Sequence, residues 1–432
     1  MPALAAAQHQ PAHSAPPVAA APASAPCEEH HLVILDLSSH RVSATLARLH
    51  PEQPDRGEQI LAHQAIDCRW HDLSERSRRE AARDVIRLAE DQGRVDIHSA
   101  YVCAADPTLA SHPAGGYAAL GADVTLTAGD VATALRRCRE QATGVDRELV
   151  DLLPTVWRVR SRNGEREVAQ PVGEVGHALT CDGILITARA GHRAALEGLC
   201  QDIDLYCEGV LARPLALYRG VVGRLGQRGS SLVIDCGGRH TQVLVQRQRR
   251  LVHIETHPFG GDDLTHRLAD EFNLDVELAE RLKHGVDLAM ARVREHEGQQ
   301  TLADLLGSDG IAGDPRLPAA AALCRQEIER QFRALAEDLR TQGILAQTGT
   351  IHLVGRGALL GGLVGVLREI FDLKVVLGSG DRGRDPASEL VDILTSGLVL
   401  VAADRRRADL ASRTDVRRQV SGLWQWLTAK LV

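Results

Sequence analysis

The stretch from Ser230 to Gln246, which reads SSLVIDCGGRHTQVLVQ, decides the fold. Its two apolar runs, Leu232–Ile234 and Val243–Val245, flank a turn that contains Gly237 and Gly238. This pattern predicts a β-hairpin, and glycine permits a tight turn because it has no Cβ. A concave run of backbone N–H groups at such a turn binds anions. The stretch predicts a phosphate loop, and an ordinary hairpin whose glycines serve only the turn is the alternative.

A weaker copy of the same unit lies near the N-terminus, where His31–Leu49 reads HLVILDLSSHRVSATLARL. Asp36 follows the apolar run of this copy, as Asp235 follows the apolar run of the other. Two strand–Asp–turn–strand units about two hundred residues apart predict a duplicated α/β core with a nucleotide in the cleft between its halves. Because a carboxylate at a strand end can hold a hydrated metal ion beside a phosphate, both aspartates are candidate metal residues.

These two units resemble the actin-like ATPase superfamily and, within it, the FtsA cell-division family. The resemblance covers about residues 31–432 and implies an actin-like, two-lobed α/β fold that binds ATP between its lobes. It assigns Mg²⁺, held through water, to Asp36 and Asp235. The phosphate-binding residues that it implies are Ser38, Ser39 and Arg41 in the first loop, and Gly237, Gly238 and Thr241 in the second.

Three later segments extend the resemblance. His257–Ala269 opens a helix with two glycines, and the exposed N–H groups of a helix N-terminus favour an anion. Glu277–Gly285 places an acid and a lysine on one helix face, and Thr350–Leu363 carries a glycine-rich loop that lets the backbone approach a flat base. The nucleotide-binding residues that these segments imply are Gly260, Gly261, Glu280, Lys283, Gly355, Gly357 and Ala358. A capped helix, a surface ion pair and an ordinary βα turn are the alternatives.

The loops also depart from the family pattern. Arg239, His240 and Gln242 replace the Gly, Thr and Asp of the usual second loop, and Arg356 replaces a Gly of the adenosine loop. A bulky Arg239 either contacts a phosphate or blocks the loop. These changes imply at most weak ATP hydrolysis, with ATP acting as a conformational ligand that stabilises an assembly-competent state.

Residues 107–205 interrupt the plain actin pattern. Gln170–Leu179, which reads QPVGEVGHAL, is similar to a segment of the extra subdomain that distinguishes FtsA and the pilus protein PilM from other actin-like proteins. In the family this subdomain contacts other subunits and other division proteins. A generic α+β insertion is the alternative.

The chain ends in an amphipathic segment, Val416–Val432, after a charged stretch at 404–415 that we expect to be a linker. Apolar residues recur at helical spacing, and tryptophan at the boundary of an apolar face is typical of a helix in a membrane interface. The membrane-binding residues predicted here are Leu423, Trp424, Trp426, Leu427 and Leu431. The alternative is a terminal helix that docks on the body of the protein. No apolar run approaches the length that spans a bilayer.

The composition argues against nucleic-acid binding and indicates the cellular compartment. The chain has 432 residues, a formal net charge of −7 and only 3% aromatic residues. A mildly acidic chain has no bulk attraction to nucleic acid. Nine cysteines without C-x-x-C spacing, and no secretory signal, indicate a reduced cytosolic protein. The first thirty residues are rich in Ala and Pro and predict a disordered tail.

The expected organisation follows from the resemblance. Its parts are a tail at 1–30, a first-lobe core at 31–106, an inserted subdomain at 107–205, a connecting helix at 206–222, a second-lobe core at 223–262 and 343–385, a second-lobe subdomain at 263–342, a closing helix at 386–403, a linker at 404–415 and an amphipathic helix at 416–432.

The function that the resemblance implies is bacterial cell division at the cytoplasmic face of the membrane. Such a protein binds ATP, assembles with itself and tethers FtsZ filaments through its last helix, with the C-terminal tail of FtsZ on the subdomain at 263–342. Two alternatives stay open, a PilM-like adaptor of a pilus or secretion machine and a small-molecule kinase or ATPase on the same fold.

Overall fold

The computed structural model describes residues 25–26, 31–49, 58–142, 144, 146–225, 229–248, 250–292, 300–307, 314–380 and 383–429. For residues 25–26, 223–225, 292 and 410–429 it describes the backbone alone. Most of the expected tail lies outside these ranges, but Ala25–Pro26 (β1) pairs in parallel with Val95–Asp96 (β5).

The first lobe is a five-stranded sheet in the order β11-β6-β2-β3-β4. In chain order, the first three strands of this sheet (β2, β3 and β4) form an antiparallel meander. The strand β6 then pairs in parallel with β2, and β11 pairs in parallel with β6. The strands are β2 (His31–Ser38), β3 (Arg41–Arg48), β4 (Gln59–Asp67), β6 (Ser99–Ala104) and β11 (Tyr206–Leu211). The hairpin expected at the N-terminal unit is therefore present.

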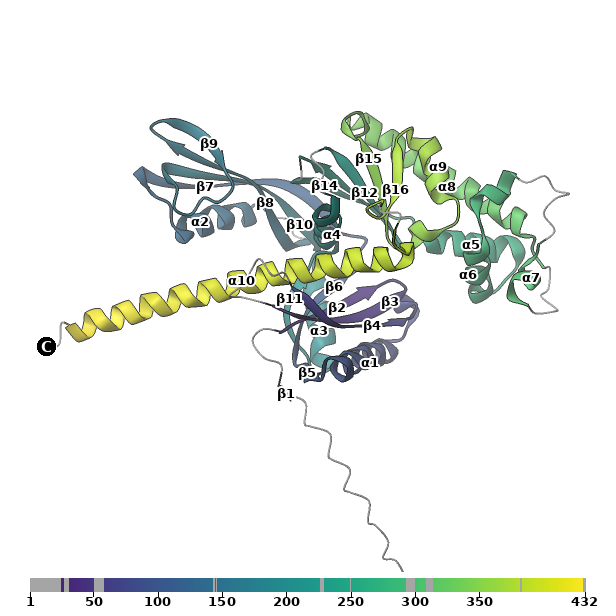
Figure 1. The fold of residues 1–432 in the computed structure, drawn as a ribbon, viewed down its shortest axis with the longest axis horizontal. Helices are drawn as coiled ribbons and strands as arrows, with labels where there is room; N and C mark the ends of the chain where they lie inside the picture. Colours follow the sequence, from purple (N-terminus) through teal and green to yellow (C-terminus); the bar gives the residue numbers. More distant parts are fainter. Residues whose placement is uncertain are drawn as a thin grey trace, which may run out of the picture.

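The second lobe repeats this arrangement strand for strand, in the order β14-β13-β12-β15-β16 (Figure 1). A meander of three strands is again followed by two parallel strands beside the first one. The strands are β12 (Ser231–Cys236), β13 (Thr241–Arg247), β14 (Arg250–His257), β15 (Thr350–Val354) and β16 (Lys374–Leu377). The predicted duplication of the core is confirmed by this shared topology.

Helices cover both sheets. The helix α1 (Glu75–Gly93) begins after Ser74, whose side chain accepts a hydrogen bond from the backbone of Ser77, and packs on β3 and β4. In the second lobe, α8 (Leu317–Thr341) packs on α9 (Leu363–Phe371), which contacts β16. The other elements of this lobe are α5 (Gly261–Phe272), α6 (Val276–Gly285), α7 (Leu302–Leu306), and the 3₁₀ helices η3 (Leu288–Arg292), η4 (Leu345–Gln347) and η5 (Arg356–Leu359), while η2 (Trp70–Asp72) precedes α1.

The inserted subdomain is a separate four-stranded sheet, in the order β7-β10-β8-β9, with one helix on it. Its own small core includes Ala118, Ala134, Leu179 and Cys181. The elements are β7 (Ala110–Thr125), α2 (Ala128–Arg139), β8 (Arg147–Ser161), β9 (Gly164–Val168) and β10 (Val175–Arg189). The helix α3 (His192–Asp202), which we had placed in this subdomain, packs instead on β11 of the first lobe.

Two long helices run between the lobes and hold them together. The helix α4 (Arg213–Leu225) crosses α10 (Pro386–Ala429) so closely that glycine is required on both sides. A Cβ on Gly220 would lie 1.9 Å from the carbonyl oxygen of Ile393, and a Cβ on Gly397 would lie 1.8 Å from that of Ala216. This crossing fixes the two halves of the core against each other.

The helix α10 also corrects two expectations about the C-terminal region. The stretch at 404–415 is helical rather than a linker, so one continuous helix leads from the core towards the C-terminus (Figure 1). By length and composition, Pro386–Asp409 is apolar enough to cross a membrane, contrary to our expectation, but 56% of its apolar window is buried in the protein. Such burial is typical of a core helix.

We predict that Gly220→Ala lowers the free energy of unfolding by about 1–3 kcal/mol, because the added methyl group forces α4 and α10 apart. Gly198→Ala is the matched control, since Gly198 also lies in a helix but has open space around its Cα. Removing a helical glycine there should raise stability by roughly 0.5–1 kcal/mol. Urea unfolding of both variants tests this, and equal effects would contradict the tight crossing.

Candidate functional site

A cavity of about 700 Å³ lies between the two lobes, where both hairpins end. Most of the residues predicted to bind nucleotide or metal line it: Asp36, Ser38, Ser39, Arg41, Asp235, Gly237, Gly238, Gly261, Glu280, Lys283, Gly355 and Gly357. The other three predicted residues, Thr241, Gly260 and Ala358, are not among the described residues that line the cavity. Thr241 is buried and donates its hydroxyl proton to the carbonyl oxygen of Phe259 at 2.9 Å.

The floor of the cavity is an ion-pair bridge that the sequence did not predict. Arg213 Nη1 donates to the two carboxylate oxygens of Asp36 at 3.1 and 3.2 Å, and to Ser38 Oγ at 2.8 Å. Arg213 Nε donates to Asp235 Oδ2 at 3.4 Å. The three charged side chains are only 11%, 7% and 4% exposed for Arg213, Asp36 and Asp235. The two aspartates that we expected to share a metal ion therefore share a guanidinium.

Arg213 stays protonated in this setting. Burial would lower the pKa of Arg213, but the charges of Asp36 and Asp235 more than compensate and raise it above its ordinary value. Two carboxylates and one guanidinium leave the bridge with a formal charge of −1. A Mg²⁺ ion held through water needs carboxylate oxygens that are free to accept hydrogen bonds from its water ligands. Here both oxygens of Asp36 and one oxygen of Asp235 already accept from Arg213, whose guanidinium lies between the carboxylates. These residues, as arranged, do not fit the expected metal ion.

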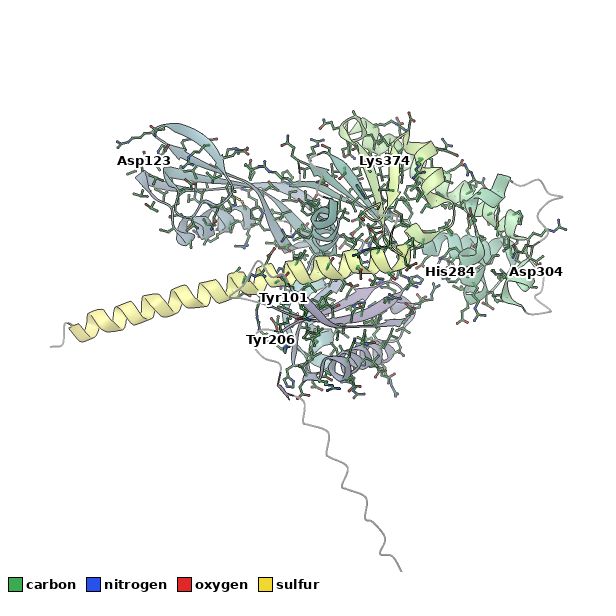
Figure 2. All side chains as sticks on the ribbon, viewed as in Figure 1. Tyr101, Asp123, Tyr206, His284, Asp304 and Lys374 are labelled. Atoms are coloured by element: carbon green, nitrogen blue, oxygen red, sulfur yellow. The ribbon has the colours of Figure 1, made fainter. Side chains whose placement is uncertain are left out.

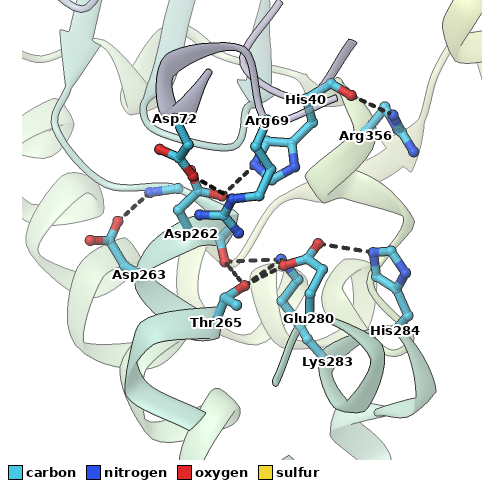
Figure 3. A network of polar contacts seen from close by, with 12 residues as sticks. His40, Arg69, Asp72, Asp262, Asp263, Thr265, Glu280, Lys283, His284 and Arg356 are labelled. Atoms are coloured by element: carbon cyan, nitrogen blue, oxygen red, sulfur yellow. Dashed lines mark hydrogen bonds and ion pairs between the residues drawn. The ribbon is translucent and has the colours of Figure 1, made fainter. Parts of the chain in front are cut away.

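The two loops that we predicted to bind phosphate contact each other through His40. Its ring packs on Gly238 so closely that a Cβ on that glycine would lie 2.6 Å from His40 Cδ2. His40 Nε2 lies 2.5 Å from Asp262 Oδ1, which joins the first lobe to the second (Figure 3). Burial would raise the pKa of Asp262, but the hydrogen bond and charge of His40 outweigh it and lower that pKa.

The N-terminus of α5, which we predicted to bind an anion, already has partners for its first N–H groups. The amides of Gly261 and Asp262 donate to the carbonyl oxygens of Gly237 and Gly238 at 3.0 and 2.7 Å. The amide of Gly260 donates to Asp263 Oδ2 at 2.7 Å (Figure 3). This end of the helix binds the second loop of the protein itself, so a phosphate there would have to displace internal hydrogen bonds.

Lys283 and Glu280 face the cavity and form a closed network with Thr265 (Figure 3). Lys283 Nζ donates to Glu280 at 2.7 Å, to the Thr265 hydroxyl at 2.8 Å and to the carbonyl oxygen of Gly261 at 3.1 Å. Burial would raise the pKa of Glu280, but the hydrogen bond from His284 and the charge of Lys283 hold it well below its usual range. The predicted i, i+3 pair is present, and all three ammonium protons are used.

Arg356 of the second lobe lines the cavity and pairs with Asp67 of the first lobe. Its Nη1 donates to Asp67 Oδ1 at 2.7 Å, and the same oxygen accepts from Arg41 Nε at 2.9 Å. Burial would raise the pKa of Asp67, but the hydrogen bond from Arg41 and the charge of Arg356 lower it. Because Arg356 and Asp67 are about half exposed, such a pair contributes only about 0–1 kcal/mol. Arg356 stands where the family pattern has a glycine in the adenosine loop, so this substitution adds a weak ion pair between the two lobes.

Sequence analysis missed Arg213, His40 as a bridge, Asp67 and Asp262. One signal was present for Arg213, because a cation at the first residue of a helix opposes the helix dipole and needs an acidic partner. Arg356 was visible as a departure from the family pattern, and His40 as a residue of the first predicted loop. Their partners were not, since Asp67 and Asp262 lie far from them in sequence.

Comparisons with known proteins show which proteins the chain is similar to. A family model described as Cell division protein FtsA matches residues 232–394. Cell division protein FtsA of Streptococcus pneumoniae is 25% identical over 301 residues, which are 69% of this chain and 64% of that protein. Cell division protein FtsA of Rhizobium meliloti is 26% identical over 373 residues and 82% of each chain.

In sequence the chain is similar to the FtsA family of cell-division proteins. Among solved structures, a chain of a PilM–PilN type IV pilus biogenesis complex matches with a TM-score of 0.57 at 15% identity, covering 86% of this chain and 98% of that one. At that identity the match shows the fold alone. The expected actin-like α/β fold is confirmed, and the similarity to FtsA proteins agrees with the resemblance found in the sequence.

The cavity is lined in part by a buried histidine, His240, from which we predict a pH dependence of stability. Burial lowers the pKa of His240 below the ordinary 6.5, although the charge of Asp235 raises it in part, and its Nδ1 has no hydrogen-bond partner. The unfolded chain therefore takes up a proton as the pH falls through 6.5, while folded His240 stays neutral until a lower pH. The free energy of unfolding should decrease with falling pH in that window, by at most about 1.4 kcal/mol per pH unit from this group.

Urea unfolding between about pH 7.5 and about pH 5.5 tests this expectation. His240→Gln, which stays neutral, should give a shallower decrease than the wild type. An unaltered slope in His240→Gln would show that His240 does not titrate as its burial requires.

Proposed function

We propose that this FtsA-like protein binds ATP between its lobes, assembles with itself and attaches FtsZ filaments to the inner face of the cytoplasmic membrane at the division site. The observation that carries the proposal is the path of α10, which lines the cavity at its start and leads to the amphipathic end of the chain. ATP serves as a conformational ligand whose presence biases the arrangement of the lobes.

The first half of α10 is built into the body of the protein. Its residues Leu390, Leu394 and Leu398 line the cavity, and Ile393 is fully buried against α4. Three consecutive arginines then fix the helix to separate parts of the chain. Arg405 pairs with Asp151 of the inserted subdomain at 2.7 Å, Arg406 with Glu208 of β11 at 2.7 Å, and Arg407 with Glu58. A change at the cavity therefore has a rigid route to the C-terminal segment.

The second half of α10 supports the membrane part of the proposal. The backbone stays helical to Ala429 and continues past the lobes rather than folding back on them (Figure 1). The side chains of the predicted membrane residues Leu423, Trp424, Trp426 and Leu427 fall outside the described side chains, and Leu431 lies outside the described residues. Their helical spacing in the sequence still places Leu423, Trp424 and Leu427 on one face.

The cavity supports the nucleotide part of the proposal. Its volume of about 700 Å³ falls within the range of small-molecule sites. Glycines at positions 237, 238, 355 and 357 line it and allow close approach of a ligand to the backbone. The Mg²⁺ expected at Asp36 and Asp235 is not part of this proposal, because Arg213 already binds both carboxylates.

We place the surfaces for assembly on the two subdomains that project from the core. The inserted subdomain and the second-lobe subdomain project in opposite directions, with Asp123 near the tip of one and Asp304 on the other (Figure 2). We place contacts with other subunits and division proteins on the inserted subdomain. The C-terminal tail of FtsZ is placed on the second-lobe subdomain at 263–342, which contains α5 to α8.

The membrane tether predicts that the full chain sediments with anionic liposomes and that Leu427→Glu abolishes most of this binding. A carboxylate on the apolar face cannot enter the acyl region without a large desolvation cost. Gln425→Glu is the matched control, because it adds the same charge on the opposite face of the helix. Equal binding of the two variants, or undiminished binding by a chain that ends at Asp415, would remove the tether from the proposal.

A PilM-like adaptor shares the fold, and the partner separates the two functions. We expect the protein to co-sediment with FtsZ filaments and to lose this association with FtsZ that lacks its C-terminal tail. Binding to an inner-membrane peptide of a pilus machine, without binding to FtsZ, would favour the adaptor. The kinase alternative needs a general base near the transferred phosphate, whereas the residue at that loop is Gln242, which is fully buried and bonded to Thr256 at 3.3 Å.

A further inference from the structure

We propose that Arg213 is a resident cation that takes the place of Mg²⁺ in this FtsA-like site, so that the two lobes are bridged, and nucleotide is bound, without a divalent metal. The inference deepens the proposed nucleotide binding and rests on it for the identity of the ligand. The bridge itself depends only on residues of this chain.

The position of Arg213 follows from the duplication of the core. Asp36 lies near the end of β2 and is paired with Ser43 of β3 and Cys103 of β6. Asp235 lies near the end of β12 and is paired with Gln242 of β13 and Val354 of β15. The two aspartates therefore hold equivalent places in the two sheets, and one guanidinium contacts both.

The carboxylate oxygens show that little remains for a metal ion. Both oxygens of Asp36 accept hydrogen bonds from Arg213, and one of them also accepts from Ser38. Asp235 Oδ2 accepts from Arg213 Nε. Asp235 Oδ1 has no hydrogen-bond partner, but it faces the backbone of Gly355, where a Cβ would lie only 2.1 Å away. A single hindered oxygen does not make a divalent cation site.

The backbone keeps Arg213 in this place. It is the first residue of α4, it precedes Pro214, and α4 is locked against α10 at Gly220 and Gly397. A cation at the N-terminus of a helix is opposed by the helix dipole, so the two aspartates are needed to offset that cost. Because the guanidinium is buried and doubly paired, its removal leaves two buried carboxylates without a counter-charge.

The consequence is a site whose charge balance is set by the protein. Two carboxylates and a divalent ion would sum to zero, whereas two carboxylates and Arg213 sum to −1. The site therefore attracts phosphate less strongly than a metal-loaded one, and binding has to rely on the nucleoside and the loops. It also keeps its inter-lobe bridge in the absence of any ligand.

The test compares thermal unfolding of the full chain without nucleotide, in Mg²⁺ and in a chelator. We expect the wild type to melt at the same temperature in both. Arg213→Gln should melt at a lower temperature in the chelator and recover part of the loss in Mg²⁺, because the freed carboxylates then bind the ion. Arg405→Gln is the matched control, since it also removes a paired, partly buried arginine, and Mg²⁺ should not restore its stability.

If Arg213→Gln does not fold, metal binding and melting of the wild type still test the inference. Mn²⁺ binding to the wild type, followed by paramagnetic resonance, should be absent at this site. A bound ion that Asp36→Asn or Asp235→Asn abolishes would overturn the inference, as would a wild type that melts higher in Mg²⁺.

A titration with a fluorescent ATP analogue separates this inference from the proposed function. The wild type should bind the analogue equally well in Mg²⁺ and in chelator, while Arg213→Gln should bind it at least about tenfold more tightly in Mg²⁺, as expected for one regained charge-assisted contact. Binding by the wild type that requires Mg²⁺ would overturn the inference and leave the proposed function intact. Absence of binding under all conditions would refute the nucleotide part of the proposed function, and the melting data would still decide the role of Arg213.

Discussion

The contact on which the structure depends is the buried ion-pair bridge between Asp36, Arg213 and Asp235. Charges are buried at a large desolvation cost, and only close pairing offsets it. The two aspartates come from different sheets, so the bridge exists only while the lobes keep one relative position. That requirement couples the chemistry of the cavity floor to the packing of the whole molecule.

The packing that meets this requirement is the crossing of α4 and α10. Gly220 and Gly397 let the two backbones come together, and α4 then presents Arg213 at its first turn. The same α10 forms a wall of the cavity and continues towards the C-terminus. Three properties, namely lobe spacing, cavity shape and the direction of the terminal helix, therefore depend on a single helix pair.

Sequence reasoning could predict the duplicated core because each hairpin is local. Strand, turn and strand lie within twenty residues in His31–Leu49 and in Ser230–Gln246, so apolar pattern and turn glycines suffice. The bridge could not be predicted, because Arg213 lies 177 residues from Asp36 in the sequence and its role depends on tertiary packing. The prediction of a linker at 404–415 was wrong for the same reason. Arg405 and Arg406 read as solvated charges, yet each finds an acid on a distant strand.

The departures from the family pattern at Arg239, His240, Gln242 and Arg356 lie in or beside the loops predicted to bind a nucleotide, while the duplicated topology of the core is retained. The side chains of Arg213, His40 and Arg356 each make a polar contact that joins the two lobes. In each case a contact that a ligand could supply is supplied by the protein. Because ion pairs of the protein itself hold the two lobes together, the molecule needs no ATP hydrolysis to keep its outer surfaces available to partners. The parts that remain free to act are the two projecting subdomains and the end of α10, and these are the parts through which a tether between a filament and a membrane would work.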